Sequence, residues 1–340
     1  MMSSFLLAAC LLAAQPVSAS SDYLSRADVR SFIESMSKEH GIASADLERI
    51  LGAVRYTPAA VRLLGPVPSS APSPARSYAR YRARFLTPAL ISAGSQFWSL
   101  HAEALARAEA EFAVPSEVIV GILGVETAFG SNTGSFRVID ALATIAFDGE
   151  RRRDYFRDEL KELLLLARDS GIDPLVIKGS YAGAVGLPQF MPSSYRRYAV
   201  DFDGDGAIDL LGSPADAIGS VASYIKAFGW VVGEVPAAPV RLASGSEENF
   251  VSGLERVHDV SDAQSKGVVF SGRDPPAGLC SIFELPTPGK PSKFVAGFTN
   301  FEVVTRYNRS TFYASAVLEL GEAILKARSH VQLASATNAP

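Results

Sequence analysis

The stretch GILGVETAFG, residues 121–130, places one ionisable side chain, Glu126, in an otherwise uncharged and mostly apolar run. If the run is a helix, none of the positions three or four residues away from Glu126 holds a Lys, Arg or His. Burying a lone carboxylate is costly, and desolvation raises its pKa, so the neutral acid is favoured. The pattern predicts a general acid on a buried helix. A Glu at the edge of the core, paired with a distant Arg, is the alternative.

The composition indicates a folded protein with a sizeable core. The chain has 340 residues, 48% hydrophobic and 20% charged, which favours two or three packed units. The net charge of -4 gives no overall bias toward nucleic acid, so none is expected as a partner. Of the two cysteines, Cys10 lies in the apolar N-terminal segment, and Cys280 is expected to be a buried small residue without a disulfide partner.

The N-terminus predicts an exported, periplasmic protein. The apolar run FLLAACLLAA is followed by VSA, a small-residue cleavage site, which predicts a signal peptide over residues 1–19. The residues LAAC, which end at Cys10, also resemble a lipobox, so an outer-membrane lipoprotein anchored through Cys10 is the alternative. No later apolar run is long enough for a membrane helix.

The periodicity predicts a mainly α fold with a smaller β part, in the α+β class. Helical spacing covers residues 25–53, and single helices are expected over 95–112, 115–129, 154–169, 216–228 and 307–327. Helical spacing fades over residues 231–298, where short runs such as GVVF and CSIFEL are typical of strands. The predicted organisation is a signal peptide (1–19), an N-terminal helical segment with a Pro-rich connector (20–94), a helical core (95–230), a small β-rich domain (231–298) and a C-terminal segment that returns to the core (299–330).

The stretch YARYRARF, residues 78–85, alternates aromatic rings with three arginines. A solvated helix face is one interpretation. The other is a groove wall that meets an anionic or sugar ligand, carried by Arg80, Arg82 and Arg84.

A second glycine-rich stretch, KGSYAGAVGLPQFMPSSY, covers residues 178–195. Its glycines favour turns that present backbone N–H groups and side-chain amides to a ligand. Acyl transfer by Ser180 is disfavoured because the Gly-x-Ser-x-Gly pattern is absent and the four histidines are scattered. The sequence also lacks zinc-binding motifs.

The acidic stretch DFDGDGAIDLLG, residues 201–212, resembles a calcium loop. Four carboxylates stand at positions 1, 3, 5 and 9, and position 7 would supply a backbone carbonyl. Position 12 is Gly212 instead of Glu, and Ser213 and Asp216 lie near it but out of register. A structural Ca²⁺ or Na⁺ is one interpretation and an Asx-rich turn that caps helices is the other. The candidate metal ligands are Asp201, Asp203, Asp205, Ala207 and Asp209.

Taken in order, several blocks resemble those of the B-type lytic murein transglycosylases. They are GVETAFG, DALATIAF, ERRRDYF, KGSYAGAVGLPQFMPSSY, DFDGDGAIDL, DAIGSVASYI and FTNFEVVTRYN. The resemblance covers about residues 21–321 and implies a lysozyme-like helical core. It also implies cleavage of the β-1,4 bond between N-acetylmuramic acid and N-acetylglucosamine, with a 1,6-anhydro product. A hydrolytic muramidase of the same fold and a catalytically silent peptidoglycan-binding protein are the alternatives.

The resemblance also implies roles for individual residues. Glu126 matches the family's single general acid and base, assisted by the substrate's own N-acetyl group. No cofactor is implied for the chemistry. The implied partners are peptidoglycan glycan strands and cell-wall synthesis enzymes, and the protein is expected to be a monomer. The residues matched to substrate binding are Ser180, Gln189, Tyr307, Asn308, Arg151, Arg152, Tyr81, Tyr224 and Tyr313.

Overall fold

The computed structural model describes residues 23–64 and 76–337, so the predicted signal segment, Cys10 and most of the Pro-rich connector lie outside the described residues. The described chain is mainly helical with a small antiparallel sheet, which confirms the predicted fold class. Within these residues, no helix combines the length and the hydropathy needed to span a membrane.

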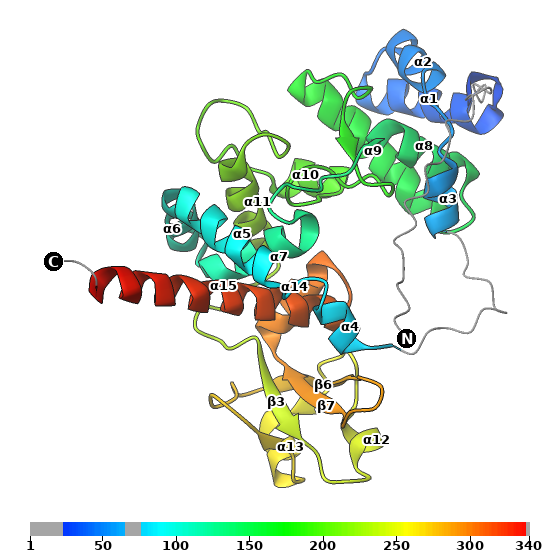
Figure 1. The fold of residues 1–340 in the computed structure, drawn as a ribbon. Coiled ribbons are helices and arrows are strands. Elements are labelled where there is room, and N and C mark those ends of the chain that lie inside the picture. Colours follow the sequence, from blue (N-terminus) through cyan, green and yellow to red (C-terminus); the bar gives the residue numbers. More distant parts are fainter. Residues whose placement is uncertain (1–22, 65–75, 338–340) are drawn as a thin grey trace, which may run out of the picture.

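The N-terminal part is a set of short helices at one end of the molecule (Figure 1). Residues 25–53 form two helices instead of one continuous pattern, because Gly41 adopts a left-handed conformation with φ of 68° and ends the first. Asp148 of the helical core binds this part: the hydroxyl of Tyr23 and the guanidinium of Arg26 both donate to its carboxylate. The elements are η1 (Tyr23–Ser25), α1 (Ala27–His40), α2 (Ser44–Gly52) and α3 (Pro58–Leu64).

The helical core follows. The single helix expected over residues 95–112 is two helices, because the backbone leaves the helical region at His101 with φ of -117° and ψ of 28°. The break lets the first half pack on the C-terminal helix and the second half pack on a later core helix, α11 (Pro214–Ala227). The elements are α4 (Tyr78–Arg82), α5 (Pro88–Leu100), α6 (Ala102–Phe112), α7 (Ser116–Thr127), β1 (Phe136–Arg137), α8 (Val138–Asp148), α9 (Arg153–Ser170), β2 (Lys178–Gly179), α10 (Pro192–Tyr198) and α11 (Pro214–Ala227).

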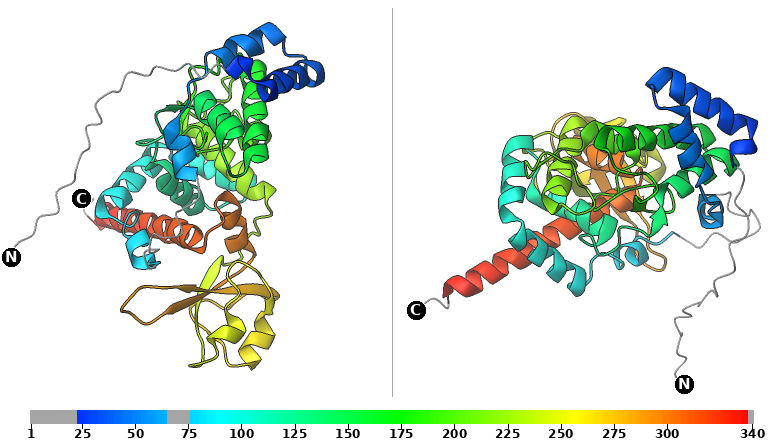
Figure 2. Two further views of the ribbon diagram at one scale, coloured as in Figure 1. Left: turned by 90° about the vertical axis from the view of Figure 1, so that its right-hand side faces the viewer. Right: turned by 90° about the horizontal axis from the view of Figure 1, so that it is seen from above.

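The β-rich segment lies at the opposite end from the N-terminal helices (Figure 2). Its sheet has the strand order β4-β6-β7-β3-β5, and every neighbouring pair is antiparallel. Its own apolar cluster includes Cys280, which is fully buried as expected. The elements are β3 (Ala237–Arg241), α12 (Glu247–Phe250), β4 (His258–Asp259), α13 (Val260–Ser265), β5 (Val269–Phe270), β6 (Leu279–Leu285) and β7 (Lys293–Gly297).

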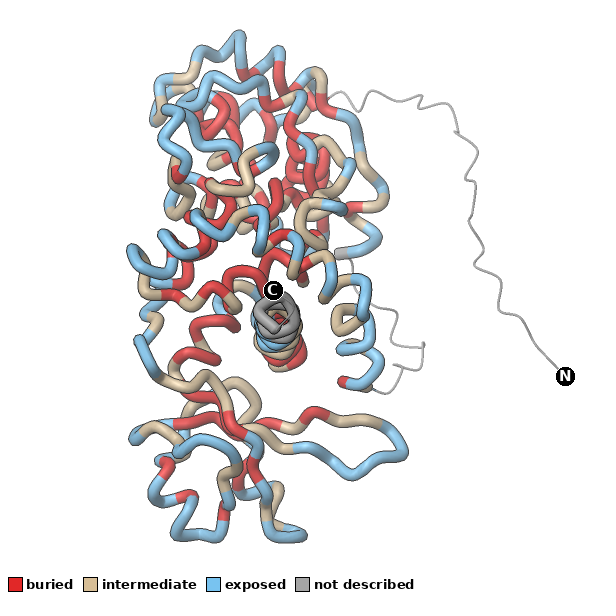
Figure 3. The backbone as a smooth tube through the Cα atoms, turned by 60° about the vertical axis from the view of Figure 1, so that its left-hand side comes forward, coloured by how far each residue is buried: buried red, intermediate tan, exposed pale blue. Residues whose placement is uncertain are grey.

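Two C-terminal helices, α14 (Thr299–Tyr307) and α15 (Thr311–Thr337), return to the core. The helix expected to begin at residue 307 therefore begins at Thr311, after a break that follows Tyr307. Helix α15 crosses the middle of the molecule between the helical core and the sheet, where its first turns are buried (Figures 1 and 3).

Helices α7 and α15 cross in close contact because each contributes a glycine to the crossing. A Cβ added at Gly121 would overlap the carbonyl oxygen of Val317, and one added at Gly321 would overlap the carbonyl oxygen of Glu117. Each glycine costs its helix about 1 kcal/mol relative to Ala. The close packing of α7 on α15 offsets this cost. It also fixes the position of α7, the helix that carries Glu126.

Replacing Gly121 by Ala is expected to lower the melting temperature, because the added methyl group meets backbone that cannot rotate away. Overpacking costs roughly 1–3 kcal/mol, which exceeds the gain of about 1 kcal/mol in helix propensity. The matched control is Gly124→Ala on the same helix, whose methyl group would meet only the ends of the Leu320 and Phe129 side chains. Thermal unfolding of both variants checks this, and equal losses would contradict the backbone argument.

Candidate active site

An open groove of about 530 Å³ lies against the C-terminal end of α7. The segment after α4, the first half of α5 and the turn after α7 form its walls. Among the described residues that line this groove, Glu126 is the one carboxylate. The lining residues are Arg84, Phe85, Thr87, Ala89, Leu90, Ala93, Gly124, Val125, Glu126, Thr127, Ala128, Ser131 and Asn132.

Glu126 stands in the last turn of α7, one residue before the helix ends at Thr127. The predicted continuation to Phe129 does not occur, because Ala128 and Phe129 both have left-handed φ values of 49° and 59°. Their N–H groups bond the carbonyls of Gly124 and Leu123 and so close the helix. Such conformations are uncommon outside glycine and tend to cluster at functional sites. This sharp end leaves Glu126 half-buried and facing the groove.

The environment of Glu126 favours the protonated acid. Burial raises the pKa of this carboxyl to about 7, although the hydroxyl of Tyr313, which donates to Oε1 at 2.6 Å, acts to lower it. Apolar packing therefore outweighs the hydrogen bond. At neutral pH the group is divided between its acid and base forms, as a residue that first donates and then accepts a proton requires.

The glycine-rich stretch folds into a loop fastened to the end of α7. The hydroxyl of Thr127 donates to the carbonyl of Leu187 at 2.8 Å, which fixes this loop beside Glu126. Gln189 has a left-handed φ of 52°, and its amide nitrogen donates to the carbonyls of Thr133 and Gly186. Because both amide protons are used, the Gln189 side chain can offer its carbonyl oxygen to a ligand.

Ser180 stands in the same loop system, joined to it through bridges of Val185 to Gly179 and to Phe190. Its hydroxyl oxygen accepts hydrogen bonds from the backbone N–H groups of Ala182 and Ala184. The hydroxyl proton is then available for donation. Ser180 and Gln189 therefore offer one donor and one acceptor, which suits a sugar hydroxyl or an N-acetyl group.

Three of the predicted tyrosines form a contiguous set around Glu126. Tyr313 donates to the carboxyl, and its ring stacks on Tyr307 with centroids 6.4 Å apart. Tyr307 in turn donates to the carbonyl of Pro188 at 2.6 Å and contacts the ring of Tyr224. Tyr224 is buried, and its hydroxyl bonds the carbonyl of Arg306. Because the three hydroxyls already have protein partners, these tyrosines support the site in this structure. Asn308 is exposed and directly follows Tyr307 at the end of α14.

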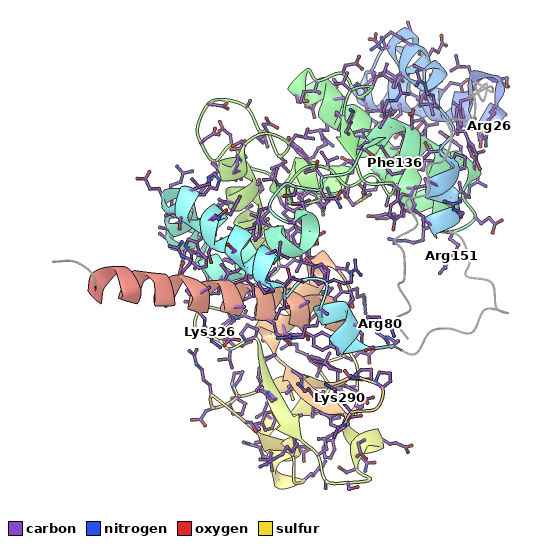
Figure 4. The ribbon with its side chains drawn as sticks, viewed as in Figure 1. Arg26, Arg80, Phe136, Arg151, Lys290 and Lys326 are labelled. Carbon is purple, nitrogen blue, oxygen red and sulfur yellow. The ribbon has the colours of Figure 1, made fainter. Side chains whose placement is uncertain are left out.

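Arg151 and Arg152, the two arginines matched to substrate binding, lie farther along the molecule, at the turn that starts α9. Both are exposed, and Arg152 has a left-handed φ of 55°. Its guanidinium lies over the ring of Tyr155 at 4.1 Å from the centroid. The pKa of Tyr224 is raised mainly by burial. The nearby side chain of Tyr155 also raises it, to a smaller extent. In Figure 4, Arg151 projects from this part of the molecule.

Tyr81 is half-buried and packs its ring on Phe85 and Phe312. Burial raises its pKa most, and the charges of Arg84 and Glu126 act on it in opposite directions. The sequence reasoning did not single out Thr87, Ser131 and Asn132, which line the groove with Glu126. The signal that could have found the last two is their position directly after the helix end, in the run GSNTG.

The acidic loop gathers a different set of carboxylates from the predicted one. Oxygens of Asp201, Asp203 and Asp216 all lie within 4.8 Å of one another. Asp205 and Asp209 are outside this group, and each accepts hydrogen bonds from N–H groups of its own turn. Asp216, which the register argument set aside, is buried and accepts three backbone N–H groups of the loop. Three converging carboxylates fit a hard cation.

A helical core whose groove holds a single carboxyl with a raised pKa among its described residues defines a lysozyme-like enzyme of glycan cleavage. Comparison with protein families gives the same class and a narrower assignment. The model of the transglycosylase SLT domain matches residues 25–322. The chain belongs to the transglycosylase SLT family.

Individual relatives agree with this assignment. The chain is 41% identical to the membrane-bound lytic murein transglycosylase B of Escherichia coli over 315 residues, which is 90% of this chain and 85% of that protein. The lytic transglycosylase Slt35 of Escherichia coli, solved in complex with calcium, has a TM-score of 0.82 at 40% identity, covering 91% of this chain and 96% of that one. SltB3 of Pseudomonas aeruginosa, solved with NAG-anhNAM-pentapeptide, has a TM-score of 0.76 at 30% identity, covering 89% of this chain and 80% of that one. The protein is a peptidoglycan lytic transglycosylase.

Proposed function

We propose that Glu126 is the general acid and then the general base of this reaction. As an acid it protonates the oxygen of the scissile glycosidic bond. As a base it then removes the proton from the C6 hydroxyl of the muramyl unit, whose oxygen closes on C1 to give a 1,6-anhydro product. The observation that carries the proposal is a pKa raised to about 7 by burial, on the one carboxylate among the described residues that line the groove.

The absence of a second carboxylate from the described groove walls favours this single-acid scheme. A glycosidase with two carboxylates places the second one across the scissile bond, either as a nucleophile or as the base that activates water. The groove instead offers Thr87, Ser131 and Asn132, which are uncharged. In the single-acid scheme the substrate's own C6 hydroxyl replaces the attacking water.

We assign the glycan strands of peptidoglycan as the substrate. The glycine-rich loop beside Glu126 would orient the sugars of the strand. Gln189 is placed to accept a hydrogen bond and Ser180 to donate one, and Asn308 is an exposed polar side chain next to Tyr307. Tyr313, Tyr307 and Tyr224 hold Glu126 and this loop in position, and Tyr81 packs on Phe85, a residue of the groove wall. Arg151 and Arg152 would meet carboxylates of the peptide portion.

The products of digestion test the reaction type. Purified sacculi digested by the protein should release muropeptides that are lighter by one water than hydrolysis products, as read by mass spectrometry. Release of reducing, hydrated ends would instead indicate that water attacks C1, as in a muramidase of the same fold.

We propose a structural calcium site formed by the carboxylates of Asp201, Asp203 and Asp216. Its support is their convergence within 4.8 Å, and the calcium complex of the related Slt35. This revises the predicted ligand set, because Asp216 takes the place that the missing carboxylate at position 12 leaves open. Sodium in the same loop is the alternative.

Added Ca²⁺ is expected to raise the melting temperature of chelator-treated protein, since a ligand that binds only the folded state stabilises it by mass action. At 100 times the dissociation constant the gain is about 2.7 kcal/mol. Asp203→Asn should remove most of this shift. The matched control is Asp205→Asn, an exposed carboxylate of the same loop outside the converging group, which should keep the shift.

If millimolar Ca²⁺ leaves the melting temperature of the parent protein unchanged, the site does not bind calcium. Repeating the titration with Na⁺ at constant ionic strength separates the two ions.

We also propose that the protein works in the periplasm, where its substrate lies. The support is the predicted signal peptide and the membrane-bound relative. Whether Cys10 carries a lipid anchor is tested by mass spectrometry of the mature N-terminus, and a chain that begins at Ser20 would reject the anchor.

A further inference from the structure

The groove that holds Glu126 also holds one cationic side chain, Arg84, which the proposed mechanism does not use. A tight turn after α4 places it there, with the N–H of Arg84 bonded to the carbonyl of Tyr81. Its guanidinium lies over two rings, 5.6 Å from the centroid of Tyr81 and 5.2 Å from that of Phe85. Stacking on aromatic rings limits the freedom of the side chain before any ligand arrives.

Its neighbours in the same segment have different surroundings. Arg82 forms an ion pair with Glu319 on α15, so its charge is already compensated. Arg84 is exposed and, among the described residues, has no carboxylate within salt-bridge distance. Arg80 is exposed as well, and is absent from the residues that line the groove. Only Arg84 combines an uncompensated charge with a place in the groove wall.

The charge of Arg84 also leaves the acid unaffected. Burial and the hydrogen bond from Tyr313 account for the pKa of Glu126, and Arg84 does not contribute to it. Both charges nevertheless act on the hydroxyl of Tyr81, which therefore lies within electrostatic reach of each. An anion bound at Arg84 would compensate the charge of the guanidinium, and its own negative charge would favour the protonated form of Glu126.

From this arrangement we propose that Arg84 binds a carboxylate of the peptide stem on a muramyl unit next to the scissile bond. The inference rests on the proposed function, because it takes peptidoglycan as the substrate. The sugars of the strand are uncharged wherever the lactyl group is amide-linked to a peptide, so the stem supplies the anions. A guanidinium fork pairs with a carboxylate through two parallel hydrogen bonds, and the rings under Arg84 hold the fork in place.

A second source of the same chemistry is the lactyl carboxylate, which is free on strands that have lost their peptides. Three substrates separate the sources: strands with intact stems, amidase-treated strands with free lactyl groups, and strands whose carboxylates have been converted to amides. The stem assignment predicts that Arg84 matters on the intact strands and not on the other two.

Arg84→Ala is expected to raise KM about fivefold on intact strands with little change in kcat, as for a partly exposed ion pair of about 1 kcal/mol. Amidation of the substrate should raise the KM of the parent protein to the same extent, and should not raise that of the variant further. Arg84→Lys should recover part of the loss. The matched control is Arg80→Ala, which removes the same charge from the same segment outside the groove and should leave KM unchanged.

An effect of Arg84→Ala on amidase-treated strands alone would overturn the stem assignment in favour of the lactyl carboxylate. Equal effects on charged and amidated strands, or none on any of them, would reject carboxylate binding altogether. These results are separable from failure of the proposed function, since Glu126→Gln abolishes cleavage of all three substrates only if the catalytic assignment holds.

Discussion

The Glu126→Gln variant is expected to solubilise sacculi at least ~100-fold more slowly than the parent protein, the scale on which a general acid contributes. The amide keeps the size and shape of the side chain, and it removes the proton that the glycosidic oxygen must receive. Substrate binding should persist, because Gln189, Ser180 and Arg84 are untouched. Sedimentation with intact sacculi measures the binding and release of soluble muropeptides measures the rate.

The same substitution separates a catalytic from a structural role. A neutral amide does not carry the desolvation cost that raises the pKa of Glu126, so the variant should melt no lower than the parent protein at pH 8. The matched control is Glu117→Gln. Glu117 is half-buried on the same helix and its pKa is also raised by burial, but it lies outside the groove. Unchanged activity in Glu126→Gln, or equal losses in both variants, would contradict the catalytic assignment.

Sequence reasoning reached Glu126 because its signal is local. One carboxylate in an apolar helical run has no partner at the neighbouring helix positions, and this can be read without knowing the fold. The structure adds the hydrogen bond from Tyr313, which comes from α15, a helix 187 residues later in the chain. A contact of that sequence separation has no signature in spacing, and the family resemblance gave Tyr313 only as a substrate-binding residue.

Asp216 and Arg84 illustrate why the residues proposed for the metal site and for the peptide carboxylate could not be singled out from the sequence. Register counting excluded Asp216 because the acidic loop was treated as a fixed template. The folded loop closes around this buried carboxylate through three backbone N–H groups, although Asp216 stands four positions beyond position 12. The alternation of YARYRARF left three arginines equivalent, and the turn after α4, together with the ion pair of Arg82, distinguishes Arg84 from its neighbours.

Some helix boundaries were predicted wrongly because packing between distant segments sets them. The predicted continuous helix over residues 95–112 has no Gly or Pro to mark its break at His101. Packing decides the break, since α5 faces α15 and α6 faces α11. At the end of α7 the pattern predicted a helix as far as residue 129, yet Ala128 already leaves the helix. Ala128 and Phe129, the two residues after Thr127, take left-handed conformations that their propensities disfavour. As a result the helix ends early and Glu126 faces the groove.

Cleavage is expected to slow as the pH rises through 7, because only the protonated form of Glu126 can act as the acid. With a pKa of about 7, kcat/KM should fall roughly tenfold per pH unit on the alkaline side, hence about 100-fold by pH 9. The initial rate of muropeptide release, measured at constant ionic strength, gives the midpoint of this limb. A flat profile between pH 6 and pH 9 would show that the proton does not come from a group with this pKa.

Tyr313→Phe should move the limb in a direction that the geometry fixes. The Tyr313 hydroxyl donates to the carboxyl at 2.6 Å and favours the ionised form, so it holds the pKa below the value that burial alone would give. Removing it raises the pKa of Glu126, and the alkaline limb moves to higher pH. A structural role for Tyr313 would lower activity equally at all pH values and leave the midpoint in place. Movement of the midpoint to lower pH would mean that the Tyr313 hydroxyl favours the neutral acid. It would contradict the assignment of this hydrogen bond as one that lowers the pKa of Glu126.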